Sequence, residues 1–527
     1  MTTDGLTSTA ANTNTTATKS WADMWGAFLE PAVIRMLFLG FSAGIPILLI
    51  FSSLSLWLGE AGLKKSSITF FSWAALGYSF KFVWAPLVDK LPVPFLKSWL
   101  GQRRSWLLLA QLSIVGAIFW MAFTNPADGT ASLTTMAMAA VLLGFSSATQ
   151  DIVIDAYRIE SSKNKDLQAM MSSTYIVGYR IGMIVAGAGA LYLAAYFGTT
   201  KEYYQYDAWM WTYMIMAGTM AIGIITTFVI SEPDRGELAI HSTVDYLRFL
   251  FMFIIAVAGF IAVFFYSSDV VKSIKTLIKV MTINTPVMGL IIETVRLLFA
   301  VIMAVILAKL MIVFNVVNKE MVIEAYIEPI TDFFVRYGKS VAILLLLLVG
   351  LYRISDIVLG AISNVFYQDM GFLKQEIATG VKLWGVIAAI FGGFMGGALS
   401  IRYGVLKILF TGAVVSAATN LLFMLLAKSG HDITLFYIVI SADNFAAGFA
   451  GAAFIAFLSS LTNISFTAMQ YAIFSSLMTL LPKTLGGYSG SIVEGIGYSN
   501  FFLLTALMGL PVLLLIALAN KKLLVKT

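Results

Sequence analysis

Apolar stretches long enough to cross a lipid bilayer make up most of this chain. A membrane-spanning helix needs about 20 consecutive, mostly apolar residues, and such stretches follow one another along almost the whole sequence. The alternating pattern of a membrane β-barrel does not compete with them. The sequence therefore predicts an all-α membrane protein with fourteen spans, near residues 33–53, 67–88, 105–124, 133–156, 170–197, 207–230, 247–266, 290–316, 340–362, 378–399, 405–427, 434–459, 465–482 and 498–520.

Composition excludes several classes of protein. The chain is 59% hydrophobic and only 12% charged, whereas soluble domains carry about 25% charged residues. A soluble enzyme, a nucleic-acid-binding protein and a secreted disulfide scaffold are excluded. With no cysteine and only two histidines, the chain offers no thiolate or imidazole metal site. The spans show no Ser/His/Asp set, so we expect no enzyme activity, no metal and no cofactor.

Basic residues indicate the orientation, because Lys and Arg collect in cytoplasmic loops. Residues 1–20 are rich in Thr, Asn and Ser and are predicted to form a disordered cytoplasmic tail. With both termini in the cytoplasm, most of the basic loop residues fall inside. The loop 267–289 is an exception, and the spacing of Lys272, Lys275 and Lys279 predicts a short amphipathic helix on the membrane surface.

A weak internal repeat divides the chain. Residues 167–198 and 469–499 both begin near a Gln, continue through small and apolar residues and end in a Gly-rich stretch. Secondary transporters are often built from such repeats, with the substrate at the interface of the halves. We predict a cytoplasmic tail (1–30), an N-terminal six-helix bundle (31–231), a linker with two inserted transmembrane helices (232–338) and a C-terminal six-helix bundle (339–522). No GxxxxGK[ST] phosphate loop is present, so the energy must come from an ion or substrate gradient.

Ionisable residues inside spans are costly and mark candidate functional sites. Asp151 and Asp155 stand four residues apart in ATQDIVIDAYR, next to Gln150, so they share one helix face. Paired carboxylates in a low-dielectric site suit a group that binds and releases a proton. We predict proton coupling by this pair, with Lys81 and Arg180 near it to anchor an anionic substrate. A structural latch that pairs charges between helices is the alternative.

Further candidates lie in both halves. The polar or aromatic residues predicted to contact substrate are Tyr179, Arg353, Asp356, Asp443, Asn444 and Trp384. A static salt bridge is the alternative for the charged ones. Asp89 precedes a basic loop and is predicted to form a conformational latch with Arg103 and Arg104. The GGFMGG run at 392–397 predicts close helix packing or a gating contact.

Several stretches resemble the AmpG family of muropeptide permeases within the major facilitator superfamily. PLVDK followed by GQRR resembles the loop motif of the superfamily, and GGALSIRYG resembles its second copy, with Ser400 where an acid is usual. The stretches that resemble the AmpG family are FLGFSAGIPILLIFSSLSLWL, YSFKFVWAPLVDK, GQRRSWLLLAQ, GFSSATQDIVIDAYR, VGYRIGM and NISFTAMQYAIFSSL. Together they cover about residues 33–230 and 340–520.

The resemblance implies the major facilitator fold, two six-helix bundles plus two central helices, in a bacterial inner membrane. It implies proton-driven import of anhydromuropeptides from periplasm to cytoplasm, with the essential helix-4 acid at Asp151. A glycopeptide substrate would need amide partners such as Gln150, Asn444 and Gln470, and cations such as Lys81, Arg180 or Arg353. The expected partners are this substrate, protons and membrane lipids, with no nucleic acid, and we expect a monomer.

Two alternatives stay open at this point. A carrier of the same fold could move acetyl-CoA, a siderophore or a drug; acetyl-CoA would require several cations to meet its phosphates. A membrane sensor or scaffold, with the two inserted helices as its partner-binding element, is the alternative from another class.

Overall fold

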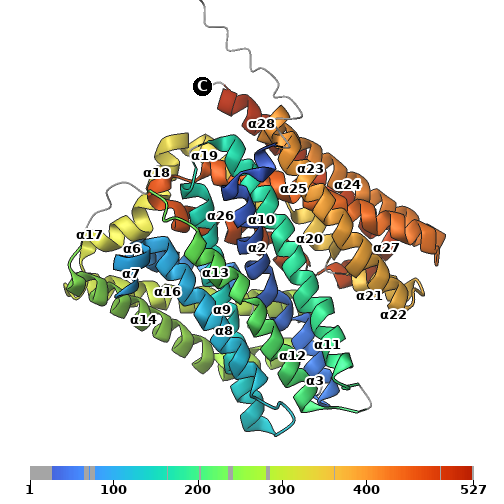
Figure 1. Ribbon diagram of the computed structural model, residues 1–527, viewed down its shortest axis with the longest axis horizontal. Coiled ribbons are helices and arrows are strands. Elements are labelled where there is room, and N and C mark those ends of the chain that lie inside the picture. Colours follow the sequence, from blue (N-terminus) through green and yellow to red (C-terminus); the bar gives the residue numbers. More distant parts are fainter. Residues whose placement is uncertain are drawn as a thin grey trace, which may run out of the picture.

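The helices of this chain form a membrane protein, as the sequence predicts (Figure 1). The structure is a computed structural model, which describes residues 26–63, 71, 77–162, 164–200, 203–234, 241–280, 285–360, 362–486 and 488–524. None of these residues forms a strand, and thirteen helices among them are long and apolar enough to span a membrane. Each matches one predicted span. Of the remaining predicted span, 67–88, residues 71 and 77–88 are described, with short helices within 77–88, and residues 67–70 and 72–76 lie outside the described residues.

The first half of the chain, which we define as residues 31–231, contributes five of these spans. Its elements are α2 (Pro31–Ile50), α3 (Ser52–Glu60), α5 (Gly77–Phe80), η3 (Lys81–Val83), α6 (Ala85–Lys90), α7 (Leu96–Leu100), α8 (Gln102–Ala122), α9 (Thr130–Glu160), α10 (Lys165–Ile184), η4 (Val185–Gly189), α11 (Ala190–Tyr196), α12 (Tyr206–Thr219) and α13 (Ala221–Val229). Proline begins α2, where a missing N–H costs nothing. The side chain of Asn164 caps α10 by accepting the N–H of Asp166.

A close approach of two backbones fixes the centre of this half. α2 packs along α10, and a Cβ on Gly178 would lie 2.0 Å from the backbone oxygen of Leu37. Only glycine permits this separation, as expected for small residues at membrane helix interfaces.

The middle of the chain holds the two helices that the sequence predicts as an insert. Its elements are α14 (Thr243–Tyr266), α15 (Ser268–Val280), α16 (Thr285–Val313), α17 (Lys319–Val322), η5 (Ile323–Ile327) and α18 (Glu328–Tyr337). Ser242 and Asp245 form a capping box at the start of α14. α14 and α16 pack on each other and few of their described residues are buried, which suits helices that face lipid. The short helix predicted for the loop after the first of them appears as α15.

The second half, residues 339–524, contributes six spans. Its elements are α19 (Lys339–Leu351), α20 (Ile354–Gly360), α21 (Ser363–Asp369), α22 (Lys374–Ile377), η6 (Ala378–Trp384), α23 (Gly385–Tyr403), α24 (Val405–Ser429), α25 (Ile433–Leu461), η7 (Ile464–Phe466), α26 (Thr467–Gly486), α27 (Ser489–Leu507) and α28 (Gly509–Leu524). Its apolar core is a cluster of aromatic and aliphatic side chains that includes Phe366, Phe423 and Phe436.

The two halves exchange equivalent contacts. α10 of the first half packs against α23 of the second, and α26 of the second half packs against α5, η3 and α6 of the first. In Figure 1, α10 and α26 both lie in the central part of the view. α10 and α26 are the two helices that carry the internal repeat. Their matching places across the interface agree with the repeat seen in the sequence.

Candidate functional site

The central acids of the candidate site lie on the long helix α9. Asp151 and Asp155 lie one turn apart on it, and both residues are buried. Because each stands in the last third of a helix of 31 residues, both lie toward the end of α9 that is formed by Glu160. We call this the Arg103 end of the molecule, since α8 begins there with Gln102 and Arg103.

Asp155 is part of a buried charge cluster. Its Oδ2 lies 3.5 Å from Nζ of Lys81 on η3, and its Oδ1 lies 3.3 Å from Nη2 of Arg158 on α9. All three residues are buried. The sequence predicted the meeting of Lys81 with the acids, but not the part of Arg158. The Asp155-to-Arg158 spacing of three residues was the signal that could have indicated it.

Asp151 and Gln150 have buried polar atoms without partners. Among the described residues, Oδ1 of Asp151 and both amide atoms of Gln150 accept or donate no hydrogen bond. Lys81 and Asp155 lie within electrostatic range of Asp151. A buried polar atom without a partner costs about 1–3 kcal/mol. Binding of a proton or a ligand at this part of α9 would recover some of that free energy.

Aromatic side chains surround the same place. The hydroxyl of Tyr78 donates to Oγ of Ser147 at 2.6 Å. Tyr175 and Tyr179 of α10 have ring centroids 6.1 Å apart, and both lie within electrostatic range of Asp151. Stacking faces and hydroxyl donors therefore lie beside the carboxylate.

Arg180 faces the second half instead of the Asp151 pair, where the sequence analysis placed it. It interacts electrostatically with Arg353 and Asp443. Asp443 also interacts with Asp356, and its Oδ1 lies 3.4 Å from the hydroxyl of Thr419. Two arginines and two acids, drawn from α10, the α19–α20 region and α25, thus form a second polar cluster between the halves.

Three predicted substrate contacts lie in other settings. Both ends of the Gln470 amide are already used within the protein: it accepts from Arg336 and donates to Asp332 and to the oxygen of Pro329. Trp384 is half-exposed at the end of η6. The amide nitrogen of Asn444 donates to the oxygen of Ile440 in its own helix.

At the Arg103 end, part of the ion pairing expected for the predicted latch is present. The guanidinium of Arg103 is fully buried and lies 2.6 Å from both Asp89 and Glu160. Arg104 does not join it. Its side chain donates to the backbone oxygens of Thr227 and Phe228 at the end of α13. The sequence missed Glu160, which closes the ion pair from the end of α9.

The two halves touch directly at this end. Oδ2 of Asp89 accepts the backbone N–H of Met469 at 3.0 Å, and Nη2 of Arg158 donates to Oγ of Ser459 at 3.2 Å. The hydroxyl of Ser173 donates to the oxygen of Gly393 in the GGFMGG run. The predicted gating stretch is therefore an inter-half contact, and the halves also touch at the Arg103 end.

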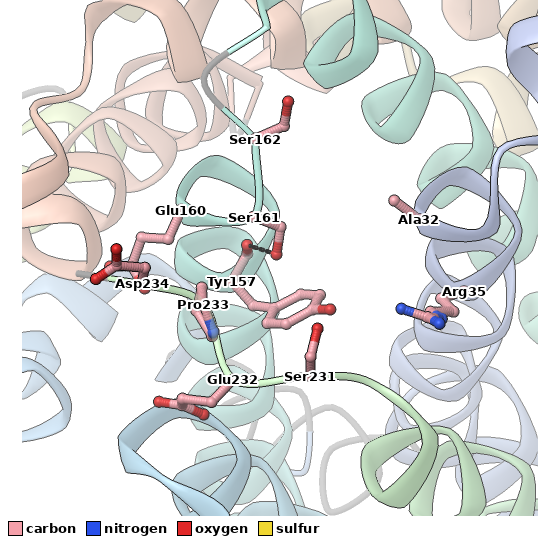
Figure 2. A pocket seen from close by; sticks show the side chains of 10 residues that line it. All are labelled: Ala32, Arg35, Tyr157, Glu160, Ser161, Ser162, Ser231, Glu232, Pro233 and Asp234. Carbon is pink, nitrogen blue, oxygen red and sulfur yellow. Dashed lines mark hydrogen bonds between the residues drawn. The ribbon is translucent and has the colours of Figure 1, made fainter.

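A pocket of about 320 Å³ lies outside this contact, on the surface of the first half (Figure 2). It lies between the start of α2, the end of α9 and the segment 231–234. Figure 2 shows Arg35 on one side and Glu232 with Asp234 on the other. Glu232 accepts the backbone N–H groups of Arg103 and Arg104, so this pocket borders the latch and is separate from the Asp151 cluster.

Comparisons with known proteins identify the family. The sequence profile of the Major Facilitator Superfamily matches residues 93–321. Putative transporter AmpG 4 of Rickettsia felis is 31% identical over 94% of this chain and 98% of its own length. The chain belongs to the AmpG family of the major facilitator superfamily. It is a membrane transporter.

Other relatives agree with this assignment. The anhydromuropeptide permease of Escherichia coli K12 is 28% identical to this AmpG-family chain, and the match covers 94% of this chain and 81% of the permease. The solved structure of the proton:xylose symporter XylE bound to 6-bromo-6-deoxy-D-glucose superposes with a TM-score of 0.57 at 11% identity, covering 94% of this chain and 95% of that one. That likeness confirms the predicted major facilitator fold.

Proposed function

We propose that this transporter imports anhydromuropeptides, N-acetylglucosaminyl-anhydro-N-acetylmuramyl peptides, from the periplasm to the cytoplasm together with protons. The observation that carries the proposal is the buried group on α9, where Asp151 and Gln150 present polar atoms without partners beside Lys81. The similarity to a named anhydromuropeptide permease along nearly the whole chain supports the substrate.

The chemistry of such a substrate fits the two polar clusters. Sugar rings stack on aromatic faces, which Tyr175 and Tyr179 offer beside Asp151. Peptide carboxylates need cations, and Arg180 and Arg353 lie near each other between the halves. Their like charges repel, so an anion placed between them would be favoured.

Proton coupling follows from the acid pair. A carboxylate buried near a second carboxylate resists ionisation, and a proton can therefore bind to the pair Asp151 and Asp155 from one side of the membrane and leave on the other. If the protein lies in a bacterial inner membrane with both termini in the cytoplasm, the Arg103 end, where the halves touch, is the cytoplasmic end. The present state would then be closed toward the cytoplasm, ready to receive substrate from the periplasm.

An uptake assay tests the proposal. Spheroplasts that make this protein are given a labelled anhydromuropeptide, with and without a protonophore. We expect accumulation that a protonophore abolishes. We expect Asp151→Asn to lose accumulation while the folded protein remains in the membrane. The matched control is Asp269→Asn, the same chemical change at a side chain that is 92% exposed, which should transport normally.

Two results would overturn the proposal. Uptake that survives collapse of the proton gradient removes the coupling. Absence of uptake, together with binding of acetyl-CoA, a siderophore or a drug to the purified protein, assigns another substrate to the same fold.

A further inference from the structure

Arg158 occupies an unusual position at the end of α9. Its side chain is 0% exposed and lies between the halves. The guanidinium pairs with Asp155 of its own helix at 3.3 Å and donates to Ser459 of α25 at 3.2 Å. It also lies 5.1 Å from the ring centroid of Tyr471 on α26 and 5.6 Å from that of Tyr175 on α10. Arg158 therefore connects a candidate proton-binding acid to two helices of the other half.

The setting makes this arginine depend on Asp155. Two of its nitrogens, Nε and Nη1, have no hydrogen-bond partner among the described residues. A buried charge that loses its counter-ion is strongly unfavourable. The contacts with Tyr471 and Ser459 are polar or cation–π contacts, which do not neutralise the charge. The carboxylate of Asp155 is what makes the buried position of Arg158 tolerable.

The other groups around Asp155 respond differently. Lys81 faces it from η3 and Asp151 from α9, while Tyr175 and Tyr471 face it from α10 and α26. Lys81 lies within range of a second acid, Asp151, when Asp155 is neutral. Arg158 interacts with Asp155, Tyr175 and Tyr471, and neither tyrosine can replace a carboxylate at neutral pH. Among these groups, Arg158 is therefore destabilised most when the Asp155 charge is lost.

We infer that Arg158 is the positioning residue that transmits the charge of Asp155 to the contact between the halves. When the Asp155 carboxylate takes up one proton, Arg158 keeps its own charge and loses its counter-ion. The guanidinium then gains most by reaching water, which requires separation of α9 from α25 and α26. Proton binding would thus loosen the Arg103 end. This inference rests on the proton coupling proposed above and adds the step that links it to opening.

Distance measurements across the Arg103 end test the inference. The natural chain has no cysteine, so spin labels can be attached at Lys165→Cys and Lys407→Cys without a background. Both lysines are exposed, one at the start of α10 and one in the first turn of α24. Double electron–electron resonance on the full chain in lipid nanodiscs, without substrate, then gives the separation of the halves as a function of pH.

The expected results are specific. The parent protein should gain a longer distance as the pH falls. Arg158→Gln should remove the pH response, and Asp155→Asn should favour the longer distance at neutral pH by about tenfold, as expected for loss of a charge-assisted contact. The double variant should show no further change beyond the single ones. Arg35→Gln, an arginine of the same half and end that faces the surface pocket, should behave as the parent.

An unchanged pH response in Arg158→Gln would overturn the inference. If that variant fails to fold, Ser459→Ala combined with Tyr471→Leu removes the contacts from the other half, and a parent-like pH response there would overturn it equally. Because no substrate is present, failure of muropeptide uptake leaves this readout intact. A pH-dependent distance that requires Arg158, in a protein that transports another substrate, would support the gate and reject the proposed substrate.

Discussion

The carboxylate of Asp89 accepts the backbone N–H of Met469 at 3.0 Å, although 380 positions separate the two residues in the chain. The other carboxylate oxygen of Asp89 binds Arg103 at 2.6 Å. One side chain therefore joins the ion pair inside the first half to the first turn of α26 in the second. The backbone N–H of Met469 is not removed by a side-chain substitution. The contact can therefore be broken only by changing Asp89 or by displacing it, for example through its partner Arg103.

Arg103 should matter more for stability than its neighbour Arg104. Arg103→Gln leaves Asp89 and Glu160 facing each other in a buried place, and breaking a buried ion pair costs about 3–5 kcal/mol. Arg104→Gln removes only hydrogen bonds to two backbone oxygens, worth about 1 kcal/mol each. Thermal unfolding of both variants in detergent measures the difference. Equal losses in the two variants would contradict this account of the latch.

The sequence predicted the spans and the acid pair because both depend on local spacing. Apolar length alone places thirteen of the spans that the structure describes, and a spacing of four residues places Asp151 and Asp155 on one face. The settings of Arg180 and Gln470 were not predictable in this way. Arg180 faces Arg353 and Gln470 binds Arg336 and Asp332, and these partners are set by how distant helices pack, which spacing does not encode.

Gln150→Leu should separate stability from transport. The amide of Gln150 is fully buried and both of its polar atoms are without partners among the described residues. Replacing it with an apolar side chain of similar size removes a penalty of about 1–3 kcal/mol, so the unfolding temperature should stay level or rise. Muropeptide uptake should fall sharply, because the substituted side chain can no longer form hydrogen bonds with the substrate.

Gln111→Leu is the matched control for that experiment. Gln111 is also fully buried and its Nε2 has no partner among the described residues, but its Oε1 accepts the hydroxyl of Thr227 at 2.8 Å within the first half. Its replacement should leave uptake per folded molecule unchanged. A stable Gln150→Leu protein with normal uptake would show that this amide has no role in transport.

Gly178→Ala should weaken the contact of α2 with α10. The added Cβ would lie 2.0 Å from the oxygen of Leu37, so the two backbones must move apart, and overpacking of this kind costs about 1–3 kcal/mol. Gly116→Ala on α8 is the control, because nothing lies within 4 Å of its added Cβ. In a helix interior, alanine is more favourable than glycine by about 1 kcal/mol, so the control should be slightly more stable than the parent. Thermal unfolding of the two variants gives the sign of each change.

Acid should weaken the link between the inserted helices and the first half. Glu324 on η5 lies 3.1 Å from both Nζ of Lys90 and Nε2 of His241. Partial burial alone would raise the pKa of the Glu324 carboxyl, but the hydrogen bonds from His241 and Lys90 outweigh it and hold this pKa below its ordinary value. A lowered pKa in the folded state stabilises the protein above the unfolded value of about 4.3, and the effect is lost as the pH falls through the folded value.

Glu324→Gln should therefore be less stable than the parent at pH 7, by up to about 1 kcal/mol for a partly exposed pair. The difference should shrink as the pH falls from the unfolded value of about 4.3 through the lowered folded value, because the parent carboxyl then takes up its proton. Glu320→Gln, at an exposed glutamate of the neighbouring α17, should match the parent throughout. Unfolding temperatures measured across this pH range decide the matter: a stability gap that stays constant with pH would mean that Glu324 acts through packing, because only a charge contribution disappears when the carboxyl is neutralised.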